Sequence, residues 1–152
     1  MASSYHVFEA AAQIEEVCAL MYREAARRFA DQPGAQAIFR QLEEEEEQHA
    51  LRVHLLAARY RDDASRFDGA SLPALRELEG LAERANREYA ELRAGRWPEG
   101  LAAVKDRFSA LEHVFAGMHA QFLAPGVAPE IHLFFSQLAE QDEAHARLLR
   151  DP

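Results

Sequence analysis

The chain has 152 residues, of which 49% are hydrophobic and 28% charged, as expected for one water-soluble domain with a single core. Its formal net charge of −9 argues against nucleic acid and anionic membrane surfaces as partners, because no basic patch could neutralise phosphates. The single cysteine, Cys18, allows neither an internal disulfide nor a cysteine-based zinc or iron–sulfur site. No apolar run approaches the ~20 residues of a membrane span, and the first residues lack the basic start of a signal peptide. We therefore expect a cytoplasmic protein.

Helix-forming residues dominate the chain and threonine is absent, which favours an all-α fold. Clusters of Pro, Gly, Asp and Ser interrupt the helical pattern at 31–34, 62–73, 95–100 and 125–129. Between them we predict five helices, at about 4–31, 34–61, 72–93, 99–124 and 129–150.

Four of these helices carry an apolar stripe in steps of three and four, the spacing of an inward-facing helix surface. Near its middle each stripe is interrupted by ionisable residues: Glu15 in the first, Glu46 and His49 in the second, Glu112 in the fourth, and Asp142 and His145 in the last. At about 1.5 Å per residue from the intervening turns, these residues lie at similar heights within each pair of helices. The sequence therefore predicts a polar layer inside a helical bundle.

The first and the last pair of helices resemble each other in sequence. Leu111–His119 repeats the pattern of Ile14–Tyr22 at an offset of 97 residues, and 137–146 repeats 41–50 at an offset of 96. We interpret this as the internal duplication of a helical hairpin within one domain of residues 1–152. The first hairpin would span about 4–61 and the second about 99–150. The helix over about 72–93 belongs to neither copy and is assigned to the crossover.

The spacing of the polar residues points to metal binding. Residues three apart share a helix face, so Glu46 and His49 can address one ion, and so can Asp142 and His145. Without cations, each buried uncompensated charge would cost several kcal/mol. Two divalent ions would offset that charge. Carboxylate and imidazole ligands without thiolate favour iron or manganese, with zinc as a further candidate.

These residues lie in four stretches, IEEVCALMYREAARRF, FRQLEEEEEQHALRVHLL, LEHVFAGMH and FFSQLAEQDEAHARLL. In spacing and order they resemble the rubrerythrin and bacterioferritin branch of the ferritin-like superfamily, over about residues 5–60 and 101–150. The resemblance implies a ferritin-like four-helix bundle of two antiparallel hairpins, with an additional helix in the crossover. It also implies two iron ions, with manganese or zinc as alternatives, held by Glu15, Glu46, His49, Glu112, Asp142 and His145.

Two positions depart from the family pattern. Asp142 stands where the family has Glu and is one methylene shorter, so any weaker or altered metal position is expected on its side. Tyr22 is the aromatic residue that the resemblance implies, and we expect it to pack and hydrogen-bond beside the metals rather than to be redox-active. Its counterpart His119 could be an extra ligand or a core histidine.

The resemblance implies a non-haem di-iron protein that acts as a ferroxidase or reacts with O2 or H2O2, and we expect a homo-oligomer. The chain lacks the CxxC pairs of a rubredoxin-type relay, so rubrerythrin-type turnover would need an external electron donor. An iron-storage subunit or a metal carrier without turnover is the alternative. A purely structural bundle is a third reading. A fourth is an oxygenase acting on an organic substrate, which would need a cavity beside the metals.

Overall fold

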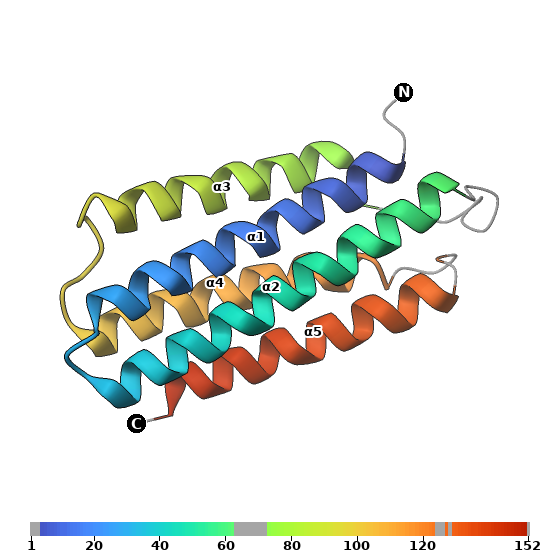
Figure 1. Ribbon diagram of the computed structural model, residues 1–152. Helices are drawn as coiled ribbons and strands as arrows, with labels where there is room; N and C mark the ends of the chain where they lie inside the picture. Colours follow the sequence, from blue (N-terminus) through green and yellow to red (C-terminus); the bar gives the residue numbers. More distant parts are fainter. Residues whose placement is uncertain (1–3, 63–72, 124–126, 128, 152) are drawn as a thin grey trace.

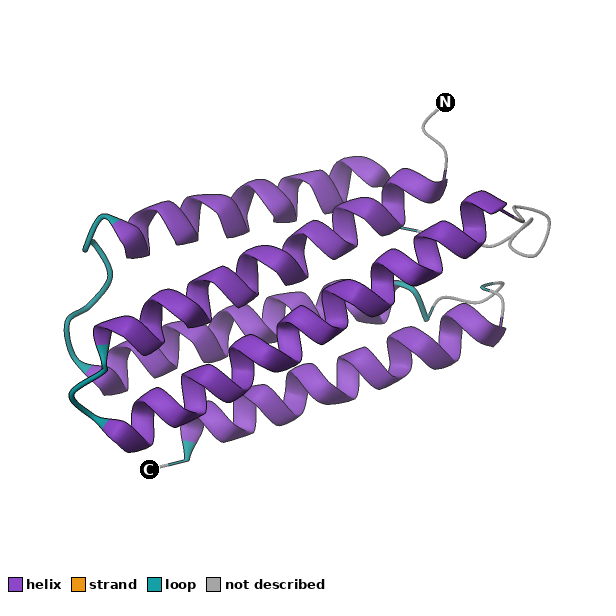
Figure 2. Ribbon diagram, in the orientation of Figure 1, coloured by secondary structure: helices purple, strands orange, loops and turns teal. Residues whose placement is uncertain are grey.

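A computed structural model describes residues 4–62, 73–123, 127 and 129–151. Its helices are α1 (Ser4–Arg28), α2 (Pro33–Asp62), α3 (Leu75–Arg93), α4 (Leu101–Gln121) and α5 (Pro129–Arg150). No strand occurs in these ranges, so the all-α prediction is confirmed (Figures 1 and 2). None of the helices in the described ranges combines the length and the apolar character that a membrane crossing requires.

All five predicted helices are present, with ends that differ by up to three residues. The first helix ends at Arg28, because residues 29–32 form the reversal that leads into α2. Pro33 takes the first position of α2, where a missing amide hydrogen costs nothing. Parts of the predicted loop at 62–73 and of the turn at 125–129 lie outside the described residues.

The end of α3 shows how sequence fixes a boundary. Gly95 has a φ of 74°, a left-handed conformation that glycine adopts without strain. The Arg96 amide donates to the Glu91 carbonyl at 2.9 Å, the long-range bond of a Schellman motif. The chain then turns toward α4 and buries Trp97 against Phe108, with ring centroids 4.8 Å apart.

The helices pack in a simple arrangement (Figure 1). α1 packs antiparallel to α2, and α4 antiparallel to α5, while α3 lies along α1 and α2 faces α5. One continuous cluster of buried apolar side chains includes residues of all five helices. The four predicted stripes are buried throughout except at Tyr60, which is half-buried. Their apolar members are Phe8, Ala11, Cys18, Tyr22, Ala25 and Phe29; Ala35, Phe39, Leu42, Val53, Leu56 and Tyr60; Val104, Phe108, Phe115 and Phe122; and Ile131, Phe135, Leu138 and Leu149. The observed packing thus follows the periodicity of the sequence.

Aromatic residues enclose the middle of the core from both ends. Toward one end, the rings of Phe122 and Phe135 stack at 3.7 Å, with Phe8 beside them at 6.3 Å from Phe135. Toward the other, Phe39 and Phe108 lie 5.7 Å apart. Burial of each such ring contributes about 1.5–3 kcal/mol. The polar layer between these two groups is therefore shielded along the helix axes.

Candidate metal centre

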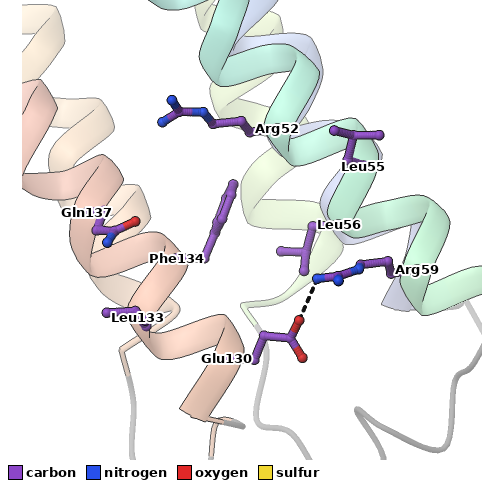
Figure 3. A pocket seen from close by; sticks show the side chains of 8 residues that line it. All are labelled: Arg52, Leu55, Leu56, Arg59, Glu130, Leu133, Phe134 and Gln137. Atoms are coloured by element: carbon purple, nitrogen blue, oxygen red, sulfur yellow. Dashed lines mark hydrogen bonds and ion pairs between the residues drawn. The ribbon is translucent and has the colours of Figure 1, made fainter.

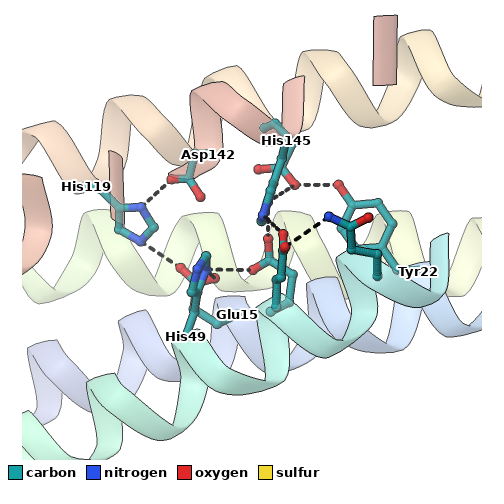
Figure 4. A network of polar contacts seen from close by, with 10 residues as sticks. Glu15, Tyr22, His49, His119, Asp142 and His145 are labelled. Atoms are coloured by element: carbon teal, nitrogen blue, oxygen red, sulfur yellow. Dashed lines mark hydrogen bonds and ion pairs between the residues drawn. The ribbon is translucent and has the colours of Figure 1, made fainter. Parts of the chain in front are cut away.

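The structure brings together all six residues predicted as metal ligands. They come from four helices and are all buried, none more than 3% exposed. They are Glu15 on α1, Glu46 and His49 on α2, Glu112 on α4, and Asp142 and His145 on α5. Figure 4 shows the side chains of Glu15, His49, Asp142 and His145 meeting between the helices. An apolar stripe buries whatever stands on it, which is why these polar groups lie in the core.

The six residues form two groups that could each hold a metal ion. One group offers ligand atoms that all lie within 4.8 Å of one another from Glu46, Glu112, Asp142 and His145. The other group offers such atoms from Glu15, Glu46 and His49. Glu46 belongs to both. Because a carboxylate has two oxygens, Glu46 could contact one ion with each of them.

Both histidines present the same ring nitrogen to the centre. Nδ1 of His49 lies 3.6 Å from a carboxylate oxygen of Glu15 and 3.6 Å from one of Glu46. Nδ1 of His145 lies 2.9 Å from Glu46 Oε1 and 3.5 Å from Glu112 Oε1. The two rings stack 5.5 Å apart, with an angle of 11° between their planes. This common orientation follows from the matching position of each histidine, three residues after an acidic one.

Four buried ligand-type atoms test whether the site fits a metal. Glu15 Oε1, His49 Nδ1, His119 Nε2 and His145 Nδ1 make no hydrogen bond of regular geometry in the described part of the chain. Their close contacts are ion pairs within the cluster itself, at 2.7 Å between His119 Nε2 and Glu15 Oε1 and at 2.9 Å between His145 Nδ1 and Glu46 Oε1. A buried polar atom without a good hydrogen bond costs about 1–3 kcal/mol, which a bound cation would offset. Oxygen and imidazole nitrogen suit iron, manganese or zinc. The residues present therefore fit a pair of divalent ions.

In the metal-free protein, protons hold the carboxylates together. Burial, and then the charges of Glu15 and Glu112, raise the pKa of Glu46 well above its ordinary value. Burial would also raise the pKa of Glu15, but a hydrogen bond with Glu46 and the positive charge of His119 outweigh it and lower that pKa. The shared proton therefore belongs to Glu46, and Glu15 accepts it.

The two histidines on the stripes also retain protons. Burial alone would lower the pKa of His49, but Glu15 and Glu46 outweigh it and raise the pKa to about 10. Burial likewise opposes the charge on His145, but Glu112 and Glu46 raise its pKa to about 11. Both imidazoles are therefore protonated at neutral pH, so a metal ion must displace a proton from each.

His119 lies between two of the candidate ligands without joining either group. It is fully buried, its Nδ1 contacts Asp142, and its Nε2 lies 2.7 Å from Glu15 Oε1 (Figure 4). Burial opposes its charge, but Asp142 and Glu15 raise its pKa well above the ordinary value. Burial raises the pKa of Asp142 to about 6, although His119 partly offsets the effect. The histidine thus holds together two carboxylates from different hairpins.

Tyr22 contacts the centre from the opposite side. Its hydroxyl donates a hydrogen bond to Glu112, and its ring stacks on Phe108 with centroids 4.5 Å apart. Burial, and then the charges of Glu112 and Glu46, raise the pKa of Tyr22 well above its ordinary value, so the hydroxyl keeps its proton. Tyr22 therefore packs and hydrogen-bonds beside the centre.

Sequence reasoning missed a further contact. The acidic residues at 43–47 other than Glu46 lie off the apolar stripe of α2, and their sequence therefore predicts a solvated face, but Glu43 is buried against Arg23 and Arg40. Glu45 accepts a hydrogen bond from His145 Nε2 at 2.7 Å, on the side of the ring away from the centre. The position of Glu45 in the sequence could have indicated this contact, because Glu45 directly precedes the stripe residue Glu46 and therefore lies at the edge of the buried face of α2.

Two hollows open between α2 and α5. The smaller, of about 260 Å³, reaches the edges of both His49 and His145. The larger, of about 490 Å³, lies further along the same helices and is mainly apolar (Figure 3). Arg52 lines both hollows, and the ion pair of Arg59 with Glu130, at 2.7 Å, borders the larger one. Small solutes therefore have a short path from the surface to the imidazoles.

The fold and the site define an all-helical protein with buried carboxylate and histidine groups that could hold metal ions. No family model, no curated protein and no solved structure matches the chain.

Proposed function

We propose that this chain is a ferritin-like di-iron carboxylate protein, a ferroxidase or an oxidoreductase that reacts with O2 or H2O2. The proposal includes a four-helix bundle of α1, α2, α4 and α5, with α3 as the crossover helix. One observation carries it. Glu46 belongs to both candidate metal groups, as a carboxylate that bridges two ions must. Two further observations support it: ligands from four helices converge, and Glu15 Oε1, His49 Nδ1 and His145 Nδ1 are buried without a regular hydrogen bond among the described residues.

The charge of the site supports two divalent ions. In the metal-free protein, the cluster carries protons on Glu46, His49, His119 and His145. Two divalent cations bring four positive charges, while release of the protons of Glu46, His49 and His145 removes three, so the exchange would change the net charge of the buried site by one unit, or by none if His119 also releases its proton. Balance matters here, because an uncompensated buried charge costs several kcal/mol.

A bound pair of iron ions would supply electrons, one from each ion, to an oxidant such as O2 or H2O2. The chain's own residues would arrange the site. Tyr22 holds Glu112 by its hydrogen bond, and His119 ties Glu15 to Asp142. The aromatic groups on both sides exclude water along the helix axes. The hollow between α2 and α5 would admit Fe(II) and the oxidant, and an external donor would return electrons.

Anaerobic addition of Fe(II) followed by air tests the proposal. We expect about two irons bound per chain, and a rise in near-ultraviolet absorbance as Fe(II) becomes Fe(III). The paired variants His49→Ala and His145→Ala should each reduce the bound iron, whereas Glu44→Gln, an exposed residue of the same acidic run, should not. A chain that binds fewer than two irons at saturation would refute the proposal.

An iron-storage subunit or a metal carrier is the alternative. Three large apolar side chains on the α2 and α5 surface are exposed, Leu51 at 60%, Leu55 at 59% and Leu133 at 61%. Contacts between copies would cover them. Gel filtration distinguishes iron storage from an oxidoreductase function, because storage requires a large shell whereas an oxidoreductase works as a small oligomer.

An oxygenase acting on an organic substrate also has an observation in its favour, the hollow of about 260 Å³ at His49 and His145. Oxygen consumption decides between this reading and a ferroxidase. A ferroxidase consumes O2 only in proportion to the Fe(II) added, whereas an oxygenase continues to consume O2 when reductant and substrate are present.

A further inference from the structure

His145 is held on both sides of its ring. Its Nε2 lies 2.7 Å from Glu45 Oε2, while its Nδ1 faces the centre, 2.9 Å from Glu46 Oε1. A carboxylate that accepts the Nε2 hydrogen leaves the Nδ1 lone pair for a metal ion. It also fixes the plane of the ring and makes the ligand nitrogen more basic.

The duplicated hairpin has a different residue at the equivalent place. Gln141 stands 96 residues after Glu45, the same offset that relates His145 to His49. Gln141 and His49 line the same hollow, but Gln141 Oε1 is buried without a hydrogen-bond partner among the described residues. His145 therefore has a bonded carboxylate at its outer nitrogen, whereas the residue equivalent to that carboxylate in the other hairpin is a neutral amide in the same hollow as His49, without a hydrogen bond of its Oε1 among the described residues.

We propose that Glu45 is a positioning residue for His145, and that the pair Glu45 and Gln141 makes the two metal positions unequal, with the tighter one at His145. The inference rests on the proposed function, since it assumes two metal ions. Hydrogen bonds to an ionised acceptor are roughly twice as strong as neutral ones. The sequence alone favours the opposite order, because Asp142 is shorter than Glu. The number of ligands favours the order proposed here, because four residues offer a ligand atom at the position of His145 and three at the position of His49.

Titration of the metal-free protein with Co(II) tests the order. We expect two separate binding steps in the unaltered chain. Glu45→Gln should weaken the tighter step about 10- to 100-fold, the usual effect of losing such a partner, and so bring the steps together. Gln141→Glu should strengthen the weaker step and also bring the steps together. Exchanging both residues should restore two separate steps. Glu44→Gln, which is exposed on the same helix turn, is the control for lost charge.

The hydrogen bond itself has a separate signature. In the proton NMR spectrum of the Co(II) protein, the exchangeable ring N–H of His145 should be protected from solvent. It should exchange faster, or shift, in Glu45→Gln but not in Glu44→Gln. Partial recovery in Glu45→Asp would show that the acceptor and not the packing is responsible, since Glu45 is 40% exposed and packs little.

The outcomes separate the two proposals. If the unaltered chain binds no pair of ions, both fail. If it binds two ions and Glu45→Gln matches Glu44→Gln within about twofold, only the role of Glu45 is overturned. If Glu45→Gln moves the two steps further apart, Glu45 acts at the weaker position, and the order assigned here is wrong.

Discussion

Metal binding should release protons, because the pKa values of several candidate ligands are raised in the metal-free protein. His49, with a pKa of about 10, and His145, with a pKa of about 11, are protonated at neutral pH in the metal-free protein. Glu46 carries a third proton, because burial and the neighbouring carboxylates raise its pKa. The same atoms must be free of protons to bind a metal. Two divalent ions should therefore displace about three protons, or about four if His119 also releases its own.

The sign of the pH dependence follows directly. Protons compete with metal for the same atoms, so the affinity falls as pH falls. For each proton released, the binding constant changes about tenfold per pH unit. The product of the two binding constants should therefore rise by about 10³ to 10⁴ per pH unit. The effect should persist across the neutral range and weaken as the pH approaches the pKa of about 10 for His49.

Calorimetric titration with Co(II) measures the release. The observed heat depends on the buffer's ionisation enthalpy, with a slope equal to the number of protons transferred. His54→Ala is a matched control: this histidine contacts Glu9 and Glu16 on the protein surface, away from the centre, and its loss should leave the slope unchanged. A slope below one proton for two bound ions would refute the reasoning, because the imidazoles would then be neutral in the metal-free protein.

Three further predictions concern stability. Tyr22→Phe removes the donor to Glu112 and should lower the free energy of unfolding of the metal-free protein by about 1.5–3 kcal/mol in urea, with two ions still bound. His119→Leu leaves Glu15 and Asp142 without their shared cation and should cost about 3–5 kcal/mol without metal, but less with metal bound; equal losses in both states would contradict the charge argument. Metal at a hundred times the Kd of each position should add about 2.7 kcal/mol per ion, about 5.4 kcal/mol for two ions, and raise Tm by about 10–20 °C in calorimetry, and a chelator should reverse the shift.

The position of each candidate ligand could be read from the sequence, because burial follows from helical periodicity. A Glu or His on an apolar stripe must lie in the core once the stripe packs, whatever its own polarity. Glu15 and Glu112 are examples, since neither belongs to a local motif and only their stripes indicate them. The helices and their pairing were predictable for the same reason. The ends of α1 and α4 were less so, because the turn residues beside them are compatible with helix and the reversal of the chain decides between the two.

Contacts across the helix interface could not be predicted in this way. Glu45 meets His145 because of the rotation of α2 relative to α5, and apolar spacing fixes that rotation only to within a stripe's width. The shared role of Glu46 likewise depends on how far side chains reach. Asp142 occupies the equivalent place in the second hairpin, but it is short and contacts His119, so it joins only one group. Glu46 and Asp142 are equivalent in sequence spacing. Only the three-dimensional structure shows that Glu46 belongs to both candidate metal groups whereas Asp142 belongs to one.

The contacts around the centre cross from one hairpin to the other. Tyr22 of the first hairpin donates to Glu112 of the second, and His119, which stands 97 residues after Tyr22, contacts Glu15 of the first. Each hairpin therefore supplies the residue that holds the other hairpin's lone glutamate. If the two hairpins are copies of one another, contacts within each hairpin alone could have kept both halves alike. Because the contacts cross, a tyrosine in one hairpin and a histidine at the equivalent place in the other act on the glutamate of the opposite hairpin. Under the function proposed above, the two metal positions would then differ in strength while the six proposed ligands keep the same spacing.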